Sequence, residues 1–116
     1  MILKPIELAR SIVNTLEDKK GENILLMDIQ DIATFTDYFI LCSGSSERMI
    51  ESLADAILEN VKKEFQMIGK KEGYAQGGWV LVDLGDVIVH LFSPEQREYY
   101  RLEELWSQGK ILLRLQ

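Results

Sequence analysis

The sequence predicts a single α/β domain in which a mixed β-sheet is flanked by helices. The length of 116 residues is that of one domain, here residues 1–116. Apolar residues recur at helical spacing in two long segments, and short apolar runs rich in strand-forming residues lie between and after them. The resulting order is helix, strand, strand, long helix, strand, strand, helix, so that a pair of strands lies on each side of the long helix.

The first helix and the first pair of strands have clear boundaries. Pro5 suits the first turn of a helix, and Gly21, which follows two lysines, can take the left-handed conformation that ends it. The apolar run NILLMDI at 23–29 predicts a buried strand. After a short connection, YFILCS at 38–43 predicts the second strand, which a Gly-Ser-Ser turn stops.

The longest helix is expected from about Glu47 to Ile68. One of its faces carries a continuous stripe of apolar side chains, and the other carries charged residues that face water. Either Ser45 or Ser46 can cap its first turn by accepting a backbone N–H bond. Gly69 is expected to terminate it.

A hairpin follows the segment 70–78, which contains three glycines and is expected to be a loop or a short edge strand. The strands Trp79–Asp83 and Asp86–Phe92 supply β-branched and apolar faces. Leu84-Gly85 lies between them, and its glycine is placed for the left-handed position of a turn with a bulge.

A last helix is predicted from Ser93 to about Trp106. Ser93 is its cap, Pro94 takes the first position, and Gln96 closes a capping box. The tail ILLRL at 111–115 is apolar and must pack against the rest of the chain.

Composition and charge restrict the classes of partner. The net charge is −6, and residues 21–60 hold eight acidic side chains against one basic residue, Arg48. Such a surface repels phosphate, so little direct contact with nucleic acid is expected, whereas a basic protein would be attracted. No apolar run approaches the roughly 20 residues that cross a membrane, and a single cysteine fits a reducing compartment. A cytoplasmic protein without a membrane partner is therefore expected.

The residues that could carry chemistry form no catalytic set. His90 and Cys42 each lie in an apolar strand without a second histidine or cysteine in the chain, and both are interpreted as structural. Gly44-Ser45-Ser46 resembles a phosphate-binding turn but lacks the lysine that such a turn needs. Asp83 and Asp86 are three residues apart across a turn, whereas two carboxylates on one strand face would be two apart. We therefore expect no cofactor and no metal.

The aromatic and acidic residues between Trp79 and Trp106 predict a docking surface for a basic protein. Tyrosine and tryptophan are enriched among residues that dominate binding energy. On the predicted last helix, Tyr99, Leu102, Glu103 and Trp106 lie at spacings of three and four and so share one face. The predicted docking residues are Trp79, Asp83, Tyr99, Glu103 and Trp106, with the aromatic rings as anchors and the carboxylates as partners of lysine or arginine. The alternative for Trp79 is a place in the core.

Three stretches of the chain resemble the ribosomal silencing factor family, also called the Iojap family. They are TDYFILCSGSS at 36–46, WVLVDLGDVIVHLF at 79–92 and EQREYYRLEELW at 95–106. Each stretch alone is a modest match, and the three together are specific. The similarity covers nearly the whole chain in the expected order.

The resemblance implies a fold similar to nucleotidyltransferases without their active-site carboxylates. It also implies binding to the large ribosomal subunit through its ribosomal protein number fourteen, which lies on the face that meets the small subunit. Occupying that face would block subunit association and lower translation under nutrient limitation. The leading hypothesis is therefore a repressor that acts by occlusion and not an enzyme. The alternative is a nucleotidyltransferase-like enzyme or a relic that still binds a nucleotide. Exposed strand edges and the apolar tail would also allow a homodimer.

Overall fold

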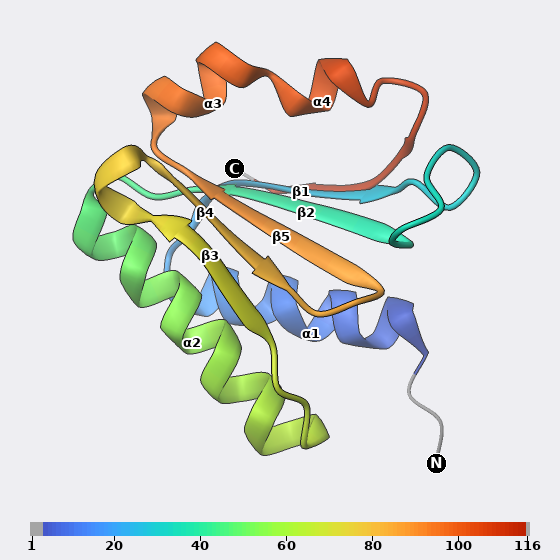
Figure 1. The fold of residues 1–116 in the computed structure, drawn as a ribbon, viewed down its shortest axis with the longest axis horizontal. Coiled ribbons are helices and arrows are strands. Elements are labelled where there is room, and N and C mark those ends of the chain that lie inside the picture. The colour runs from blue at the N-terminus through green and yellow to red at the C-terminus, as the bar shows by residue number, and fades with distance from the viewer. Residues whose placement is uncertain (1–3, 116) are drawn as a thin grey trace.

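The computed structural model describes residues 4–115 and shows a six-stranded mixed sheet with helices on both faces (Figure 1). The strand order across the sheet is β3 (Lys70–Tyr74), β4 (Trp79–Asp83), β5 (Val87–Phe92), β2 (Tyr38–Ser43), β1 (Glu22–Asp28) and β6 (Lys110–Leu115). Only β2 (Tyr38–Ser43) and β5 (Val87–Phe92) pair in parallel, and the other neighbouring strands are antiparallel. The predicted fold class, the hairpin β4–β5 and the pair of strands before the long helix are confirmed, and that pair, β1–β2, is antiparallel as well.

The two long helices cover the lower face of the sheet in Figure 1, which holds the larger core. α1 (Pro5–Asp18) buries the helically spaced Leu8, Ile12 and Leu16. α2 (Glu47–Phe65) buries a stripe of five residues along its length: Ile50, Leu53, Ala54, Ile57 and Val61. The facing side chains of the strands are mostly aliphatic, with Tyr38 and Cys42 of β2 among them, so this side is closed mainly by close-packed Leu, Ile and Val.

Two helix ends differ from the predicted ones. Lys20 (φ 65°), not Gly21, takes the left-handed conformation after α1. The glycine is needed for a different reason, because a Cβ on it would lie 2.5 Å from Cys42 Sγ. α2 ends three residues before Ile68, since Gln66 (φ 53°) is left-handed and its N–H bonds to Lys62 O. The start of α2 is as expected, with Ser46 Oγ accepting from Met49 N at 3.1 Å.

The strands agree with the sequence except at the C-terminus. β1 is Glu22–Asp28, one residue earlier than expected, and β4 is Trp79–Asp83. Residues 70–78 form the edge strand β3 (Lys70–Tyr74) and a single 3₁₀ turn, η1 (Ala75–Gly77). The apolar tail, predicted only to pack, is the strand β6 (Lys110–Leu115), which pairs with β1 and forms the other edge of the sheet.

The last helix is broken, contrary to the prediction of one helix from Ser93 to Trp106. It divides into α3 (Pro94–Tyr100) and α4 (Leu102–Leu105), because Arg101 takes a left-handed conformation with φ 47°. The predicted cap is confirmed, with Ser93 Oγ accepting from Gln96 N at 3.2 Å. Both short helices cross the upper face of the sheet in Figure 1.

The left-handed Gln66 allows a test of the α2 terminus. A residue with a Cβ costs roughly 1–2 kcal/mol in this conformation, and glycine costs far less. We expect Gln66→Gly to raise the free energy of unfolding by up to about 1 kcal/mol in urea denaturation. In the interior of the same helix, the exposed substitution Glu59→Gly should lower it by about the same amount. Destabilisation by both variants would contradict the left-handed assignment.

Candidate docking surface

The upper face of the sheet is lined by rings, in contrast to the aliphatic lower face. Alternate residues of β4, β5 and β2 point to this side, among them Trp79, His90 and Phe39. Together with rings from the β1–β2 loop, α3 and the end of α4 they form a continuous series, here called the aromatic row. Its members in spatial order are Phe35, Trp106, Phe39, His90, Trp79, Tyr100 and Tyr99.

Neighbouring rings in the aromatic row have centroids 4.6 to 5.9 Å apart. This spacing and the frequent edge-to-face angles are those that aromatic quadrupoles favour. No residue of α3 is fully buried, so this helix contacts the sheet mainly through the partly exposed rings of the aromatic row. The row therefore positions the short helices.

His90 lies at the centre of the row and is only 5% exposed. Its Nδ1 accepts a hydrogen bond from the Trp79 indole N–H at 3.2 Å, and the ring of Phe39 packs edge-on at 4.7 Å. Burial lowers the pKa of His90 from 6.5 to about 4, so the ring is neutral at pH 7. Because Nδ1 accepts, the proton of the neutral ring is on Nε2, which has no hydrogen-bond partner within residues 4–115. His90 is a structural histidine, as predicted.

Trp79 is half-buried and touches the rings of His90, Phe92 and Tyr100, the last at 4.6 Å. The side of the Trp79 ring that faces the sheet packs on His90 and Phe92, as the alternative of a place in the core expects. Its outer side supports exposed tyrosines. Tyr74 stands opposite Trp79 in the β3–β4 register, so both side chains leave the sheet on the same face.

Three tyrosines around Trp79 form an exposed aromatic patch. Tyr74 and Tyr99 are 82% and 78% exposed, and Tyr100 is 45% exposed. We call this set, with Trp79 beneath it, the tyrosine patch. Tyr74 was not among the predicted docking residues, because its strand was expected to be a loop or short edge strand. Its place beside Trp79 depends on the register in which β3 and β4 pair, and the sequence carries no signal for that register.

Asp83 lies on the same strand face as Trp79, at the far end of β4. Its Oδ1 accepts from Gly85 N at 2.8 Å and so stabilises the hairpin turn, in which Gly85 has φ 83°. Asp86 contributes its backbone carbonyl, which accepts from Asp37 N and Tyr38 N. Both aspartates act as turn residues, and the described residues hold no group of three or more metal-ligating side chains.

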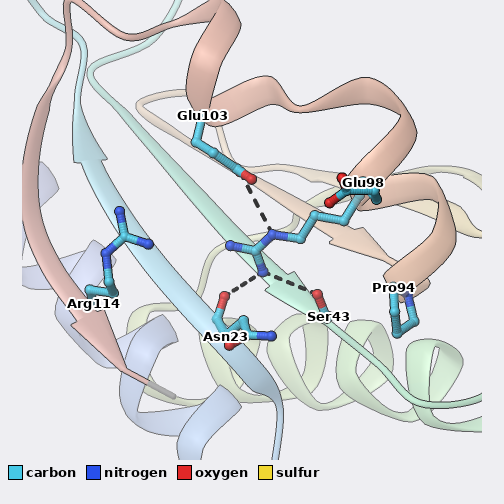
Figure 2. A pocket seen from close by; sticks show the side chains of 7 residues that line it. Asn23, Ser43, Pro94, Glu98, Glu103 and Arg114 are labelled. Carbon is cyan, nitrogen blue, oxygen red and sulfur yellow. Dashed lines mark hydrogen bonds and ion pairs between the residues drawn. The ribbon is translucent and has the colours of Figure 1, made fainter.

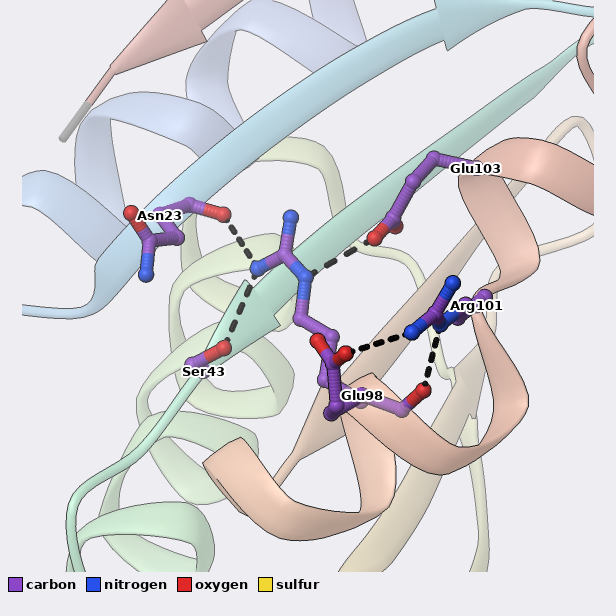
Figure 3. A network of polar contacts seen from close by, with 6 residues as sticks. Asn23, Ser43, Glu98, Arg101 and Glu103 are labelled. Atoms are coloured by element: carbon purple, nitrogen blue, oxygen red, sulfur yellow. Dashed lines mark hydrogen bonds and ion pairs between the residues drawn. The ribbon is translucent and has the colours of Figure 1, made fainter.

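Glu103 and Trp106 do not join Trp79 and Tyr99 on one face, because the break at Arg101 rotates α4 away from α3. Trp106 packs on Phe39 and Phe35 at the other end of the aromatic row. Glu103 points under the helices toward the Arg97 guanidinium, with its Oε2 3.7 Å from Nε (Figure 3). Of the five predicted docking residues, the structure thus brings together two at the tyrosine patch.

The remaining candidates are structural within the described fold. Cys42 is fully buried under α1 and α2, and burial raises the pKa of its thiol to about 12, so it carries no thiolate at neutral pH. The Gly44–Ser46 turn packs closely on α2, since a Cβ on Gly44 would lie 2.8 Å from Ile50. Its Ser46 hydroxyl already caps that helix. No helix within residues 4–115 is long and apolar enough to cross a membrane.

Comparison with known proteins gives consistent matches over the whole fold. Residues 3–114 match the model of the family described as "Ribosomal silencing factor during starvation". A protein of Halalkalibacterium halodurans named "Ribosomal silencing factor RsfS" is 39% identical over 89% of this chain and 88% of its own. A crystal structure of a Chromobacterium violaceum protein superposes with a TM-score of 0.86 at 33% identity, covering 90% of this chain and 88% of that one.

A more distant relative is a mouse protein named "Mitochondrial assembly of ribosomal large subunit protein 1". It is 30% identical over 83% of this chain, which spans 43% of its length.

The neutral, buried His90 predicts a specific loss of stability in acid. Between pH 6.5 and about 4 the unfolded chain binds a proton at this residue and the folded chain does not. Stability therefore falls as pH falls, by about 1.4 kcal/mol per pH unit within this window. From pH 7 to pH 5 we expect His90 alone to cost about 2 kcal/mol of the free energy of unfolding in urea titrations.

The matched variant is His90→Gln, which can accept the indole hydrogen bond and does not titrate. Carboxylates affect both proteins alike, so the difference between their pH profiles isolates His90. Parallel profiles for the two proteins would show that His90 is not buried in its neutral form.

Proposed function

Because the chain belongs to the ribosomal silencing factor family, we propose that it binds the large ribosomal subunit and prevents the small subunit from joining it. The contact is assigned to ribosomal protein number fourteen, on the face of the large subunit that meets the small one. By occupying this face the protein represses translation under nutrient limitation. The family description and the names of the relatives support a regulatory role at the ribosome.

The tyrosine patch is the observation that carries this proposal. The rings of Tyr74 and Tyr99 are largely exposed, and that of Tyr100 is 45% exposed. Tyr99 packs on Tyr100, and Tyr100 packs on Trp79, whose indole is bonded to His90. Rings fixed in this way lose little conformational entropy when a partner covers them. The net charge of −6 favours a basic partner, and ribosomal proteins are usually basic.

Steric occlusion follows from the size of the molecule. Its extents are 39 × 32 × 23 Å, and residues in contact across an interface approach within about 4 Å. Surfaces on either side of a body this thick could not approach each other to within contact distance at that place. Repression therefore requires a bound protein and no chemical step.

Nucleotidyl transfer, the other candidate function, receives little support from the geometry. That chemistry needs paired carboxylates that hold a metal. Asp83 is instead hydrogen-bonded within a hairpin turn, and the serine that starts α2 caps its own helix.

The exposed Tyr99 provides the direct test of the docking proposal. Tyr99→Ala should weaken binding to purified large subunits by about 1–2 kcal/mol, roughly 5- to 30-fold, with an unchanged melting temperature. In sucrose gradients the variant should need a correspondingly higher concentration to keep the subunits apart. Ile68→Ala, which removes an equally exposed apolar side chain far from the patch, should bind as the wild type does.

Wild-type affinity in Tyr99→Ala and in Tyr74→Ala would remove the patch from the interface. Normal joining of the subunits in the presence of saturating wild-type protein would refute occlusion itself. Trp79→Ala is less informative, since it also removes the hydrogen bond to His90 and should lower the melting temperature.

We further propose that the free protein forms a homodimer through β6. This strand pairs with β1 on one side only, and Ile111, Leu112 and Leu113 are all exposed. An apolar edge strand is a template for pairing with another strand. The opposite edge, β3, carries Lys70 and Lys71, which oppose such pairing.

If the dimer forms through β6, a substitution on this edge of the sheet should change the oligomeric state, and one on the β3 edge should not. Leu112→Lys should convert the protein to a monomer in sedimentation equilibrium at micromolar concentration and leave its melting temperature unchanged. Glu72→Lys on the β3 edge should leave the oligomeric state as it is in the wild type. A wild-type protein that is monomeric at every concentration tested would exclude the dimer.

A further inference from the structure

A polar pocket lies under the α3–α4 segment, at the edge where β1 begins and β2 ends (Figure 2). Its volume is about 270 Å³, and its walls come from β1, β2, α3, α4 and β6. Apart from Pro94, the described residues that line it are polar or charged. They are Asn23, Ser43, Arg97, Glu98, Glu103 and Arg114.

Arg97 is held rigidly in the pocket wall, with a side chain only 12% exposed. One terminal nitrogen, Nη1, donates to the Asn23 carbonyl and to Ser43 Oγ, the latter at 3.1 Å (Figure 3). Its Nε faces Glu103. The other terminal nitrogen, Nη2, makes no hydrogen bond to another residue within 4–115, so its N–H groups are available to a ligand.

A second guanidinium, that of Arg114 on β6, lines the same pocket from the opposite wall. Within residues 4–115 it forms no ion pair. Two arginine side chains that converge on one small space are suited to a carboxylate, which accepts parallel N–H bonds from a guanidinium.

Glu103 adds a complementary feature. Its Oε2 is buried and has no hydrogen-bond partner within the described residues, since 3.7 Å to Arg97 Nε is too long for one. A buried carboxylate oxygen without a donor is costly and is rare in folded proteins. Glu98 is engaged by the Arg101 guanidinium at 2.7 Å, so Glu103 is the acceptor that a ligand would meet.

We propose that this pocket binds a free α-amino acid. Its carboxylate would bridge Arg97 Nη2 and Arg114, and its ammonium group would donate to the accessible part of the Glu103 carboxylate, whose side chain is 29% exposed. Because opposite charges in the wall are only 3.7 Å apart, opposite charges in the ligand must be a few bonds apart, as in an α-amino acid. The carboxylates in the wall disfavour a phosphate dianion.

The size and polarity of the pocket restrict the side chain of the ligand. The volume is just below the roughly 300–1,000 Å³ of ordinary ligand sites, and the lining is polar. A small or polar side chain is therefore required. L-Serine is a suitable probe, because ethanolamine lacks only its carboxylate and 3-hydroxypropionate lacks only its ammonium group.

The experiment titrates the pure full-length protein with each compound, using calorimetry and ¹H–¹⁵N NMR. L-Serine should saturate with a Kd near or below about 1 mM, which is reasonable for so small a ligand. The largest shifts should be at Asn23, Ser43, Glu103 and Arg114. Ethanolamine, 3-hydroxypropionate and inorganic phosphate should each bind at least about tenfold more weakly.

Variants then assign the site. Arg114→Gln and Glu103→Gln should each lower the affinity for L-serine at least about tenfold, whereas Arg48→Gln, exposed on α2, should not. Arg97 is left intact, because it also ties α3 to the sheet. Absence of saturable L-serine binding, equal binding of either half-molecule, or unchanged affinity in Arg114→Gln would overturn the proposal. The ribosome is absent from these assays, so they are independent of the docking function.

Discussion

The hydrogen bond from the Trp79 indole to His90 Nδ1 is the contact on which the upper half of the molecule depends. It joins β4 to β5 on the face that the long helices do not cover, and it fixes the ring on which Tyr100 packs. α3 buries no residue of its own, and in the described part of α4 Leu102 is the buried one. The short helices are therefore held by rings, by Leu102 and by the bonds of Arg97 to β1 and β2.

This arrangement gives the two faces of the sheet different roles. The lower face is sealed by aliphatic packing against α1 and α2, which supplies most of the buried apolar area. The upper face is covered by side chains that are both apolar and polar, and Tyr74 on the edge strand β3 stays 82% exposed. Rings that are supported below and exposed above suit association, because the support exists before a partner arrives.

Local signals were sufficient to predict much of the fold. The Ser93 cap, the glycine at position 85 and the apolar stripe of α2 each act within a few residues, and the structure confirms them. The strand β6 could not be predicted, because its pairing with β1 joins segments more than 80 residues apart. The break at Arg101 could not be predicted either. The helical spacing of side chains continues across it, and the backbone conformation of this one residue decides the direction of α4.

The candidate site shows the same limit. Trp79 and Tyr99 were predicted and lie together, but Glu103 and Trp106 were placed beside them by a periodicity that the break interrupts. Tyr74 was missed because its position depends on register with Trp79 across β3 and β4. Register is a property of two strands, and neither strand alone carries it.

α3 connects the two surfaces that the structure offers to ligands. Tyr99 projects from its exposed side, and Tyr100 and Arg97 project from the side that faces the sheet. Few buried contacts fix the helix, so the bonds of Arg97 to β1 and β2 contribute much of what holds it in place. A ligand at Arg97 would change the affinity of the tyrosine patch for its protein partner only to the extent that the ligand favours one position of α3. The protein partner would then change the affinity for the ligand by the same factor. If the ligand bound one position of α3 tenfold more tightly than another, the difference in free energy would be about 1.4 kcal/mol, comparable to the contribution of one exposed tyrosine at a protein interface.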